Sequence, residues 1–123
     1  MVRSFLFVGL GGAAGSIARY GVSLAVNKVW AQPYPLATFL INITGALLIG
    51  ILFGLTSRNQ WLQNGGLLIL ATGFCGGFTT FSTFALENVT LIQKQNSVTS
   101  IVYTALSVII GLVLCRLGMW MAG

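Results

Sequence analysis

The chain has 123 residues, of which 56% are hydrophobic and only 6% are charged: six basic residues, one acidic residue and no histidine. Soluble domains carry about 25% charged residues, so this composition excludes an ordinary water-soluble protein. One acid without histidine leaves little for general acid–base chemistry, and we expect no enzyme. The basic residues are scattered singly, which argues against a nucleic-acid-binding surface.

Charge-free stretches predict where the chain crosses a membrane. A spanning helix needs about 20 predominantly apolar residues. The intervals Lys28–Arg58, Arg58–Glu87 and Lys94–Arg116 all reach that length. We therefore expect an all-α membrane protein that forms one four-helix transmembrane domain over residues 1–123, with short loops. Its spans are predicted at about residues 4–27, 36–57, 62–91 and 98–121.

The first span is rich in glycine and carries an arginine. These features differ from those of a cleaved signal peptide, so we expect a mature span. Gly11, Gly15 and Arg19 are four residues apart and share one helix face. Small residues at this spacing let another helix approach closely. Arg19 has two interpretations: it snorkels to the membrane interface, or it lines a wet vestibule and attracts anions.

Asn42 is the one strongly polar residue of the second span. An amide without partners is costly in hydrocarbon, so Asn42 must face protein or water. Two interpretations stay open: the amide bonds helices together, or its NH2 group donates to a passing solute. Thr38 and Gly45 lie on the same helix face as Asn42, which makes Thr38 a further candidate for the path of that solute.

The third span contains the stretch GFCGGFTTFSTF at residues 73–84. Each glycine weakens a helix by about 1 kcal/mol relative to alanine, and the Thr and Ser hydroxyls can bond the backbone in place of the helical ladder. The stretch therefore predicts a broken helix. Broken backbone at membrane depth is tolerated only where it is buried or lines a wet cavity, and freed carbonyls are common ion ligands. We expect an ion site here, in a small membrane transport protein.

Aromatic and acidic residues follow within the same span. Phe78, Phe81 and Phe84 are three residues apart and form a stripe, which is most often a sign of core packing. Hydroxyls interleave with these rings, which is unusual for a core surface. Glu87 lies on the same side and is the only acid of the chain. It either caps or pairs near the helix end, or it lies beside the path of a solute.

In the fourth span, Tyr103, Ser107 and Gly111 share one helix face. Tyr103 is either an interfacial belt residue or, together with Ser107, one of two hydroxyl donors along a pore. Cys75 and Cys115 lie inside predicted spans without metal-ligand spacing. We interpret both as reduced thiols that pack as small hydrophobes.

The positive charges are nearly balanced between the two sides of the predicted topology. Arg3, Arg58 and Arg116 fall on one side, and Lys28 and Lys94 on the other. The positive-inside rule therefore gives no firm orientation. Four short spans are also few to enclose a pathway. Together these features predict a homodimer, with oppositely oriented copies related by a two-fold axis in the membrane plane.

The chain resembles the fluoride channels of the Fluc (CrcB) family over essentially its whole length. The motifs that carry the resemblance are GGAAGSIARY at 11–20, ATFLINITGALLIG at 37–50 and GFCGGFTTFSTFALE at 73–87. The resemblance implies a dual-topology antiparallel homodimer in the bacterial inner membrane, with a broken third helix, two fluoride pathways and a central structural sodium ion. It also implies passive fluoride export, which lowers cytoplasmic fluoride and gives fluoride resistance.

The same resemblance implies roles for individual residues. The pore asparagine falls on Asn42 and the two pore phenylalanines on Phe81 and Phe84. The main-chain carbonyls that hold sodium fall on Gly76 and Thr79. The remaining implied residues are the pore hydroxyls of Ser82, Thr83, Tyr103 and Ser107 and the vestibule guanidinium of Arg19. The chemistry agrees, because a strongly hydrated anion needs hydrogen-bond donors and an aromatic ring has a positive edge.

Two other classes of protein compete with this interpretation. A small four-span multidrug exporter would need a membrane-embedded acid early in the chain, and the first span holds only Arg19, of the opposite sign. A non-transporting accessory protein would leave the polar face of the third span unexplained. A test of anion-gradient dissipation against proton-driven pumping of a cationic dye separates the three classes.

Overall fold

The computed structural model describes all 123 residues, and every regular element in it is a helix. Four helical stretches are long and apolar enough to cross a membrane: Val2–Val29, Leu36–Thr56, Leu68–Gln93 and Ser97–Ala122. The prediction of an all-α protein with four spans is thus confirmed. The elements in chain order are α1 (Val2–Val29), α2 (Leu36–Thr56), η1 (Leu62–Gly66), η2 (Leu68–Cys75), α3 (Gly76–Phe78), α4 (Phe81–Gln93) and α5 (Ser97–Ala122).

The start of the third span differs from the prediction. The span was expected from residue 62, but η1 is a separate π-helical turn in which Asn64 and Gly65 leave helical geometry. Gly65 has a φ of 122°, in the left-handed region that glycine adopts without a Cβ penalty. The long apolar stretch therefore begins only at Leu68.

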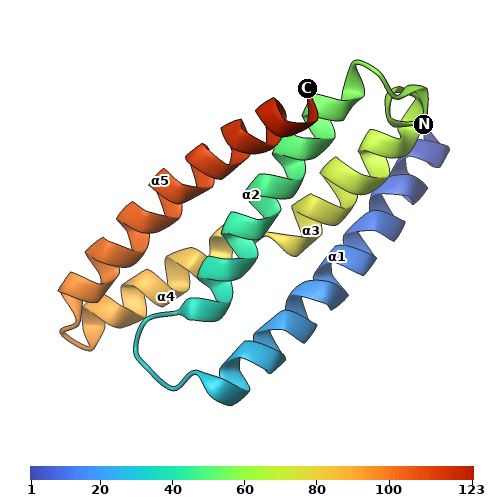
Figure 1. Cartoon of the computed structure of the whole chain (residues 1–123). Helices are drawn as coiled ribbons and strands as arrows, with labels where there is room; N and C mark the ends of the chain where they lie inside the picture. Colours follow the sequence, from blue (N-terminus) through green and yellow to red (C-terminus); the bar gives the residue numbers. More distant parts are fainter.

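The helices form two packed groups, and α4 connects them (Figure 1). α2 lies along α5, and α1 lies along η2 and α3. α4 then turns away from α1 and runs toward α5, so that the third span belongs partly to each group. Both termini lie at one end of the molecule, and the α1–α2 and α4–α5 loops lie at the other.

Glycines permit the contact between α1 and η2–α3. A Cβ atom built on Gly73 would lie 2.9 Å from Gly11 Cα, and one on Gly15 would lie 2.8 Å from Phe78 N. A methyl group on Gly77 would likewise collide with the backbone of Gly12. The predicted close approach at Gly11 and Gly15 is confirmed, and both residues are buried. We call this contact, formed by Gly11, Gly15, Gly73 and Gly77, the glycine seam.

The pair of α2 and α5 uses the same device. A Cβ atom on Gly118 would lie 2.6 Å from Leu47 O and 2.9 Å from Ile51 N, and one on Gly50 would meet the backbone of Cys115. Apolar side chains gain little from leaving lipid for a helix contact, so close backbone packing is a main source of helix association in a membrane. The glycines therefore explain why these particular faces meet.

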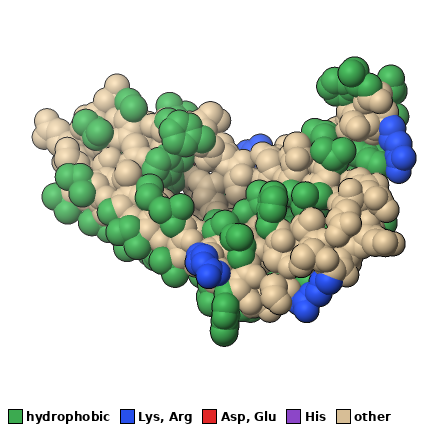
Figure 2. Space-filling model, turned by 90° about the horizontal axis from the view of Figure 1, so that it is seen from above, with side chains coloured by type: hydrophobic (Ala, Val, Ile, Leu, Met, Phe, Trp, Pro, Cys, Tyr) green, Lys and Arg blue, Asp and Glu red, His purple; other side chains and the backbone are tan.

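The surface of the single chain is largely apolar, with few charges. Figure 2 presents a face that is hollowed between two arms, with hydrophobic side chains spread over it and single basic side chains at separate positions. Many large apolar residues are exposed, among them Phe5, Ile17, Leu112 and Trp120. An exposed apolar surface of this extent is expected of helices that face lipid or another membrane chain.

Candidate functional site

The backbone between α3 and α4 is the centre of the candidate site. α3 ends at Phe78, α4 begins at Phe81, and Thr79 and Thr80 between them are extended, with ψ values of 158° and 121°. The glycines of the predicted break stay helical: Gly76 has φ −63° and ψ −37°. The glycines thus serve helix packing, and the departure from helical backbone falls on the two threonines that follow them.

Asn42 holds this junction from α2. Its Oδ1 accepts a hydrogen bond from Thr80 N at 2.9 Å, and its Nδ2 donates to Thr80 O at 3.1 Å. One amide therefore satisfies both backbone groups of a residue that has left the helix, where unpaired groups would be costly. The observed bonds are those of the helix-bonding interpretation. The second Nδ2 proton has no partner, and its donation to a solute stays a prediction.

Two carbonyls lose their helical donors at the same place. In an unbroken helix, Thr80 N would donate to Gly76 O and Thr83 N to Thr79 O. Thr80 N donates to Asn42 instead, and Thr83 N donates at 3.2 Å to the Oγ1 of Thr80, which caps α4. Gly76 and Thr79 also line a common cavity of about 450 Å³ between α2 and η2. The residues for which sodium was predicted therefore have carbonyls released from the ladder, as main-chain ion ligation requires.

Arg19 lies beside the junction on α1. Its Nε donates to Gly77 O at 3.1 Å, and its side chain is only partly buried. The guanidinium thus bonds the C-terminal end of α3, where the helix dipole favours a cation. This contact decides between neither of the two predicted roles, and the remaining N–H groups still allow an anion to approach.

A cavity of about 300 Å³ opens on the other side of the junction. Asn42, Phe81, Phe84 and Ser107 line it, together with the two junction threonines and Val108. The rings of Phe81 and Phe84 have centroids 5.9 Å apart, and Phe81 is 79% exposed in the single chain. Ser107 Oγ is buried without a hydrogen-bond partner. The cavity therefore joins ring edges, an amide N–H and an uncommitted hydroxyl.

Glu87 continues the site toward the α1–α2 loop. Its Oε2 accepts from Thr38 Oγ1 and its Oε1 from Tyr103 Oη, both at 2.8 Å. Tyr103 is completely buried, so it is not an interfacial belt residue. The Tyr103 ring packs against Phe84 with centroids 5.0 Å apart. The ring of Tyr103 thus contacts a wall residue of the phenylalanine cavity, while Glu87 fixes its hydroxyl.

A polar cavity of about 260 Å³ adjoins this cluster. Thr38, Thr83 and Glu87 line its inner side, and Asn27 and Tyr34 lie toward the loop. Tyr34 packs edge-on against Tyr103 with centroids 5.5 Å apart, and its hydroxyl is buried without a partner. Burial raises the pKa of the Tyr34 hydroxyl above its ordinary value, so the group keeps its proton near neutral pH.

The structure brings together most of the predicted residues but not all. Asn42 and Phe84 line the cavity at the junction, and Thr38 and Thr83 line the polar cavity nearer the loop; the two cavities share no lining residue. Ser82 is exposed, borders none of these cavities and lies 3.3 Å from Thr80 Oγ1. Gly111 has no atom near the position of an added Cβ.

Sequence reasoning missed three residues of the site. Thr80 caps α4, Asn88 bonds α4 to α5, and Tyr34 extends the aromatic series. Asn88 accepts from Ser100 Oγ at 2.7 Å and from Thr104 Oγ1 at 3.0 Å. A polar amide directly after Glu87 inside a span was an available signal. The buried position of Tyr34 could not be read from a loop sequence.

Comparison with known proteins gives a consistent result. Residues 6–119 match the family described as CrcB-like protein, Camphor Resistance (CrcB). A protein of Azobacteroides pseudotrichonymphae named fluoride-specific ion channel FluC is 42% identical over 118 residues, covering 96% of this chain and 94% of that protein. Proteins named FluC from Flavobacterium psychrophilum (38% over 121 residues, 98% of each chain) and FluC 1 from Listeria monocytogenes (42% over 119 residues, 97% of each chain) are similar too.

Proposed function

This chain belongs to the CrcB family of fluoride-specific ion channels. From that premise we propose that it is a multi-pass membrane protein through which fluoride leaves the cell passively. Proteins of this kind are channels and not enzymes. We place it in the bacterial inner membrane, where passive export would lower cytoplasmic fluoride and give fluoride resistance. The observation that carries the proposal is a pair of donor-lined cavities, one at the junction and one nearer the α1–α2 loop.

The proposed path begins at the phenylalanine cavity. Fluoride is small and strongly hydrated, so donors must replace its water. Asn42 and Ser107 each offer an uncommitted proton there, and Phe81 and Phe84 can present positive ring edges. A contact that solvates the ion incompletely helps it to leave as well as to enter. Thr83, Tyr103 and Thr38 would continue the path, with Ser82 contributing only if a second chain covers it.

We further propose that two antiparallel copies form the working unit, with one pore on each side. Phe81 is largely exposed and Asn42 lines open cavities, so the site of one chain is incomplete. A second copy on this face would enclose both. Gly76 and Thr79 of each copy would then hold a sodium ion through their released carbonyls, and the ion would supply a fixed positive charge beside the two anion paths. On this proposal the junction is the helix break of the third span.

Ion efflux from liposomes tests the proposed function. Purified protein is reconstituted, and fluoride and chloride release are followed with ion-selective electrodes. We expect rapid fluoride release and no chloride release. Protein that is folded and assembled but releases neither ion would refute the channel function. Release of both ions at similar rates would refute the selectivity.

Phe81→Ile separates a conducting role of the ring from a packing role. The substitution keeps an apolar side chain but removes the ring edge, so fluoride release should stop while the dimer stays assembled. Unchanged release would mean that the phenylalanine stripe only packs.

Removal of sodium tests the proposed ion site. Replacing sodium on both sides of the membrane by a larger cation should slowly abolish fluoride release, whereas full release without sodium would exclude a structural sodium ion.

A further inference from the structure

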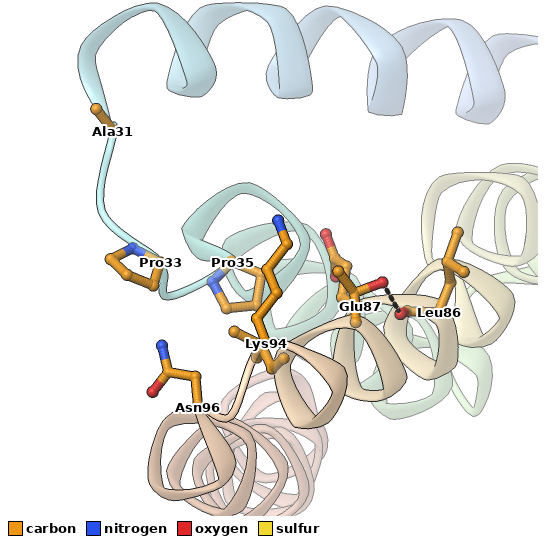
Figure 3. A pocket seen from close by; sticks show the side chains of 9 residues that line it. Ala31, Pro33, Pro35, Leu86, Glu87, Lys94 and Asn96 are labelled. Atoms are coloured by element: carbon orange, nitrogen blue, oxygen red, sulfur yellow. Dashed lines mark hydrogen bonds between the residues drawn. The ribbon is translucent and has the colours of Figure 1, made fainter.

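A further and larger cavity lies on another side of Glu87, at the loop end of the molecule (Figure 3). Its volume is about 600 Å³, and it is enclosed by the α1–α2 loop, the second half of α4 and the start of α5. Pro33 and Pro35 border it from the loop, and Leu86 and Leu91 provide apolar wall from α4. Such walls have a low dielectric constant, and they concentrate the field of any charge at the opening.

Two groups at the rim of this cavity can bind an anion. Lys94 follows the last residue of α4, is exposed, and in Figure 3 extends past Pro35 toward the space beneath the loop. Asn96 lies at the start of α5, and its Oδ1 accepts from Thr99 Oγ1 at 2.7 Å. This bond orients the amide and uses only its oxygen, so the two protons of its Nδ2 remain available to an anion.

The cavity adjoins the polar cavity described above. Pro33, Pro35 and Glu87 line both this cavity and the polar cavity that contains Tyr34. Glu87 is the only acid of the chain and would repel an anion at this point. Its two oxygens are already bound to the hydroxyls of Thr38 and Tyr103, and Lys94 bonds to neither oxygen. The charge of Lys94 is therefore free to act on an ion entering or leaving past Glu87.

We propose that this cavity is the loop-side mouth of the fluoride pathway, an anion subsite in which Lys94 and Asn96 attract fluoride and offset the charge of Glu87. The inference rests on the proposed channel function and adds a residue that concentrates the ion at the mouth. Because Lys94 is exposed to water, its effect acts through the electrostatic potential and must weaken as salt screens it.

Ionic strength provides the test. Initial fluoride release is compared for wild type, Lys94→Gln and Lys28→Gln in vesicles of neutral phosphatidylcholine. At about 10 mM ionic strength, Lys94→Gln should slow release by about threefold, the effect of one charge several ångströms from an ion in water. At about 1 M salt, where the Debye length is about 3 Å, the variant should equal wild type. Lys94→Glu should slow release further at low salt.

Lys28→Gln is the matched control. Lys28 lies at the same end of the molecule and is equally exposed, but it borders neither this cavity nor the polar one. The Lys28→Gln variant loses the same charge as Lys94→Gln and should leave fluoride release unchanged. Equal slowing by both variants would overturn the subsite, because any surface charge would then suffice. Slowing by Lys94→Gln that persists at high salt would also overturn it, since a structural defect is not screened.

Two further outcomes are decisive. An effect of Lys94→Gln that appears only in vesicles containing anionic phosphatidylglycerol would mean that Lys94 binds a lipid headgroup and would overturn the fluoride subsite. No effect at any salt concentration would do the same. These failures differ from failure of the channel function itself, in which wild type would release no fluoride under any condition.

Discussion

Two helix contacts in this molecule join apolar helices by opposite means. In the glycine seam, α1 meets η2 and α3 with backbone against backbone, and Arg19 makes the one side-chain hydrogen bond between them. Between α4 and α5, a set of polar side chains makes the contact, which we call the polar seam; its members are Glu87, Asn88, Ser100, Tyr103 and Thr104.

The difference bears on where the proposed ion path can lie. A backbone contact leaves no space, since even a methyl group would collide in the glycine seam. In the polar seam, side chains reach across by hydrogen bonds, and its member Glu87 lines two of the cavities, whereas no residue of the glycine seam lines any of the four cavities described. The glycine seam therefore serves as a close-packed scaffold, and the polar seam and the junction hold the donors of the proposed path.

Of the two seams, the glycine seam should lose more stability when a residue is substituted. Gly15→Val would drive a side chain into the backbone of Phe74 and Phe78. We expect a loss of about 3 kcal/mol in stability and little assembled protein, because the added side chain can be accommodated only by shifting backbone. Size-exclusion chromatography and thermal melting in detergent measure this. Gly111→Ala, with open space around its Cβ, should behave as wild type; an equal loss in both would mean that the seam is not special.

The second-largest effect is expected at the junction between α3 and α4. Asn42→Leu removes both partners of the Thr80 backbone, and each buried unsatisfied group costs about 1–3 kcal/mol. We expect a destabilisation of about 2 kcal/mol or more, and fluoride release should be lost. Ile43→Leu, a volume-conserving change at the neighbouring position, should cost less than about 1.5 kcal/mol. Melting unchanged by Asn42→Leu would show that water replaces the amide.

Within the polar seam, Tyr103→Phe should matter more for transport than for folding. The variant keeps the ring contact with Phe84 and removes the donor to Glu87. Loss of a hydrogen bond to a charged group costs about 1.5–3 kcal/mol, and we expect fluoride release to fall about tenfold. Tyr20→Phe on exposed α1 surface is the control. Full release from Tyr103→Phe would remove this hydroxyl from the path.

The smallest effect is expected at the edge of the polar seam. Thr104 is exposed, and Asn88 retains Ser100 as a donor when the threonine hydroxyl is lost. Thr104→Val should therefore cost less than about 1 kcal/mol and leave fluoride release unchanged. A larger loss, measured by melting, would mean that the two donors to Asn88 act as one unit.

The sequence predicted the scaffold better than the site. Hydropathy was sufficient for four spans, and the spacing of Gly11 and Gly15 was sufficient for a close helix contact. The sequence predicted a break within residues 73–84 without fixing its position, and the extended backbone lies at Thr79 and Thr80, because the partner that stabilises an extended Thr80 is Asn42. That bond joins residues 38 positions apart, which no local propensity can reveal.

Side-chain roles were harder to predict for the same reason. A helix face predicts which residues are neighbours on one element, and it placed Thr38 and Asn42 on one face of α2. It cannot predict that Tyr103 of α5 reaches Glu87 of α4, or that Tyr34 packs against Tyr103 from a loop. Of these residues, the resemblance to fluoride channels supplied Tyr103, the spacing from Phe84 supplied Glu87, and no pattern supplied Tyr34.

The common end of the two termini has a practical consequence (Figure 1). If copies insert in both orientations, as the balanced charges predict, a cleavable tag on either terminus faces outward in half of the molecules and inward in the other half. A protease added to one face of sealed vesicles would then trim half of the tags and stop. Complete trimming, or none, would reveal a single orientation, so counting severed tags measures how evenly the chain inserts.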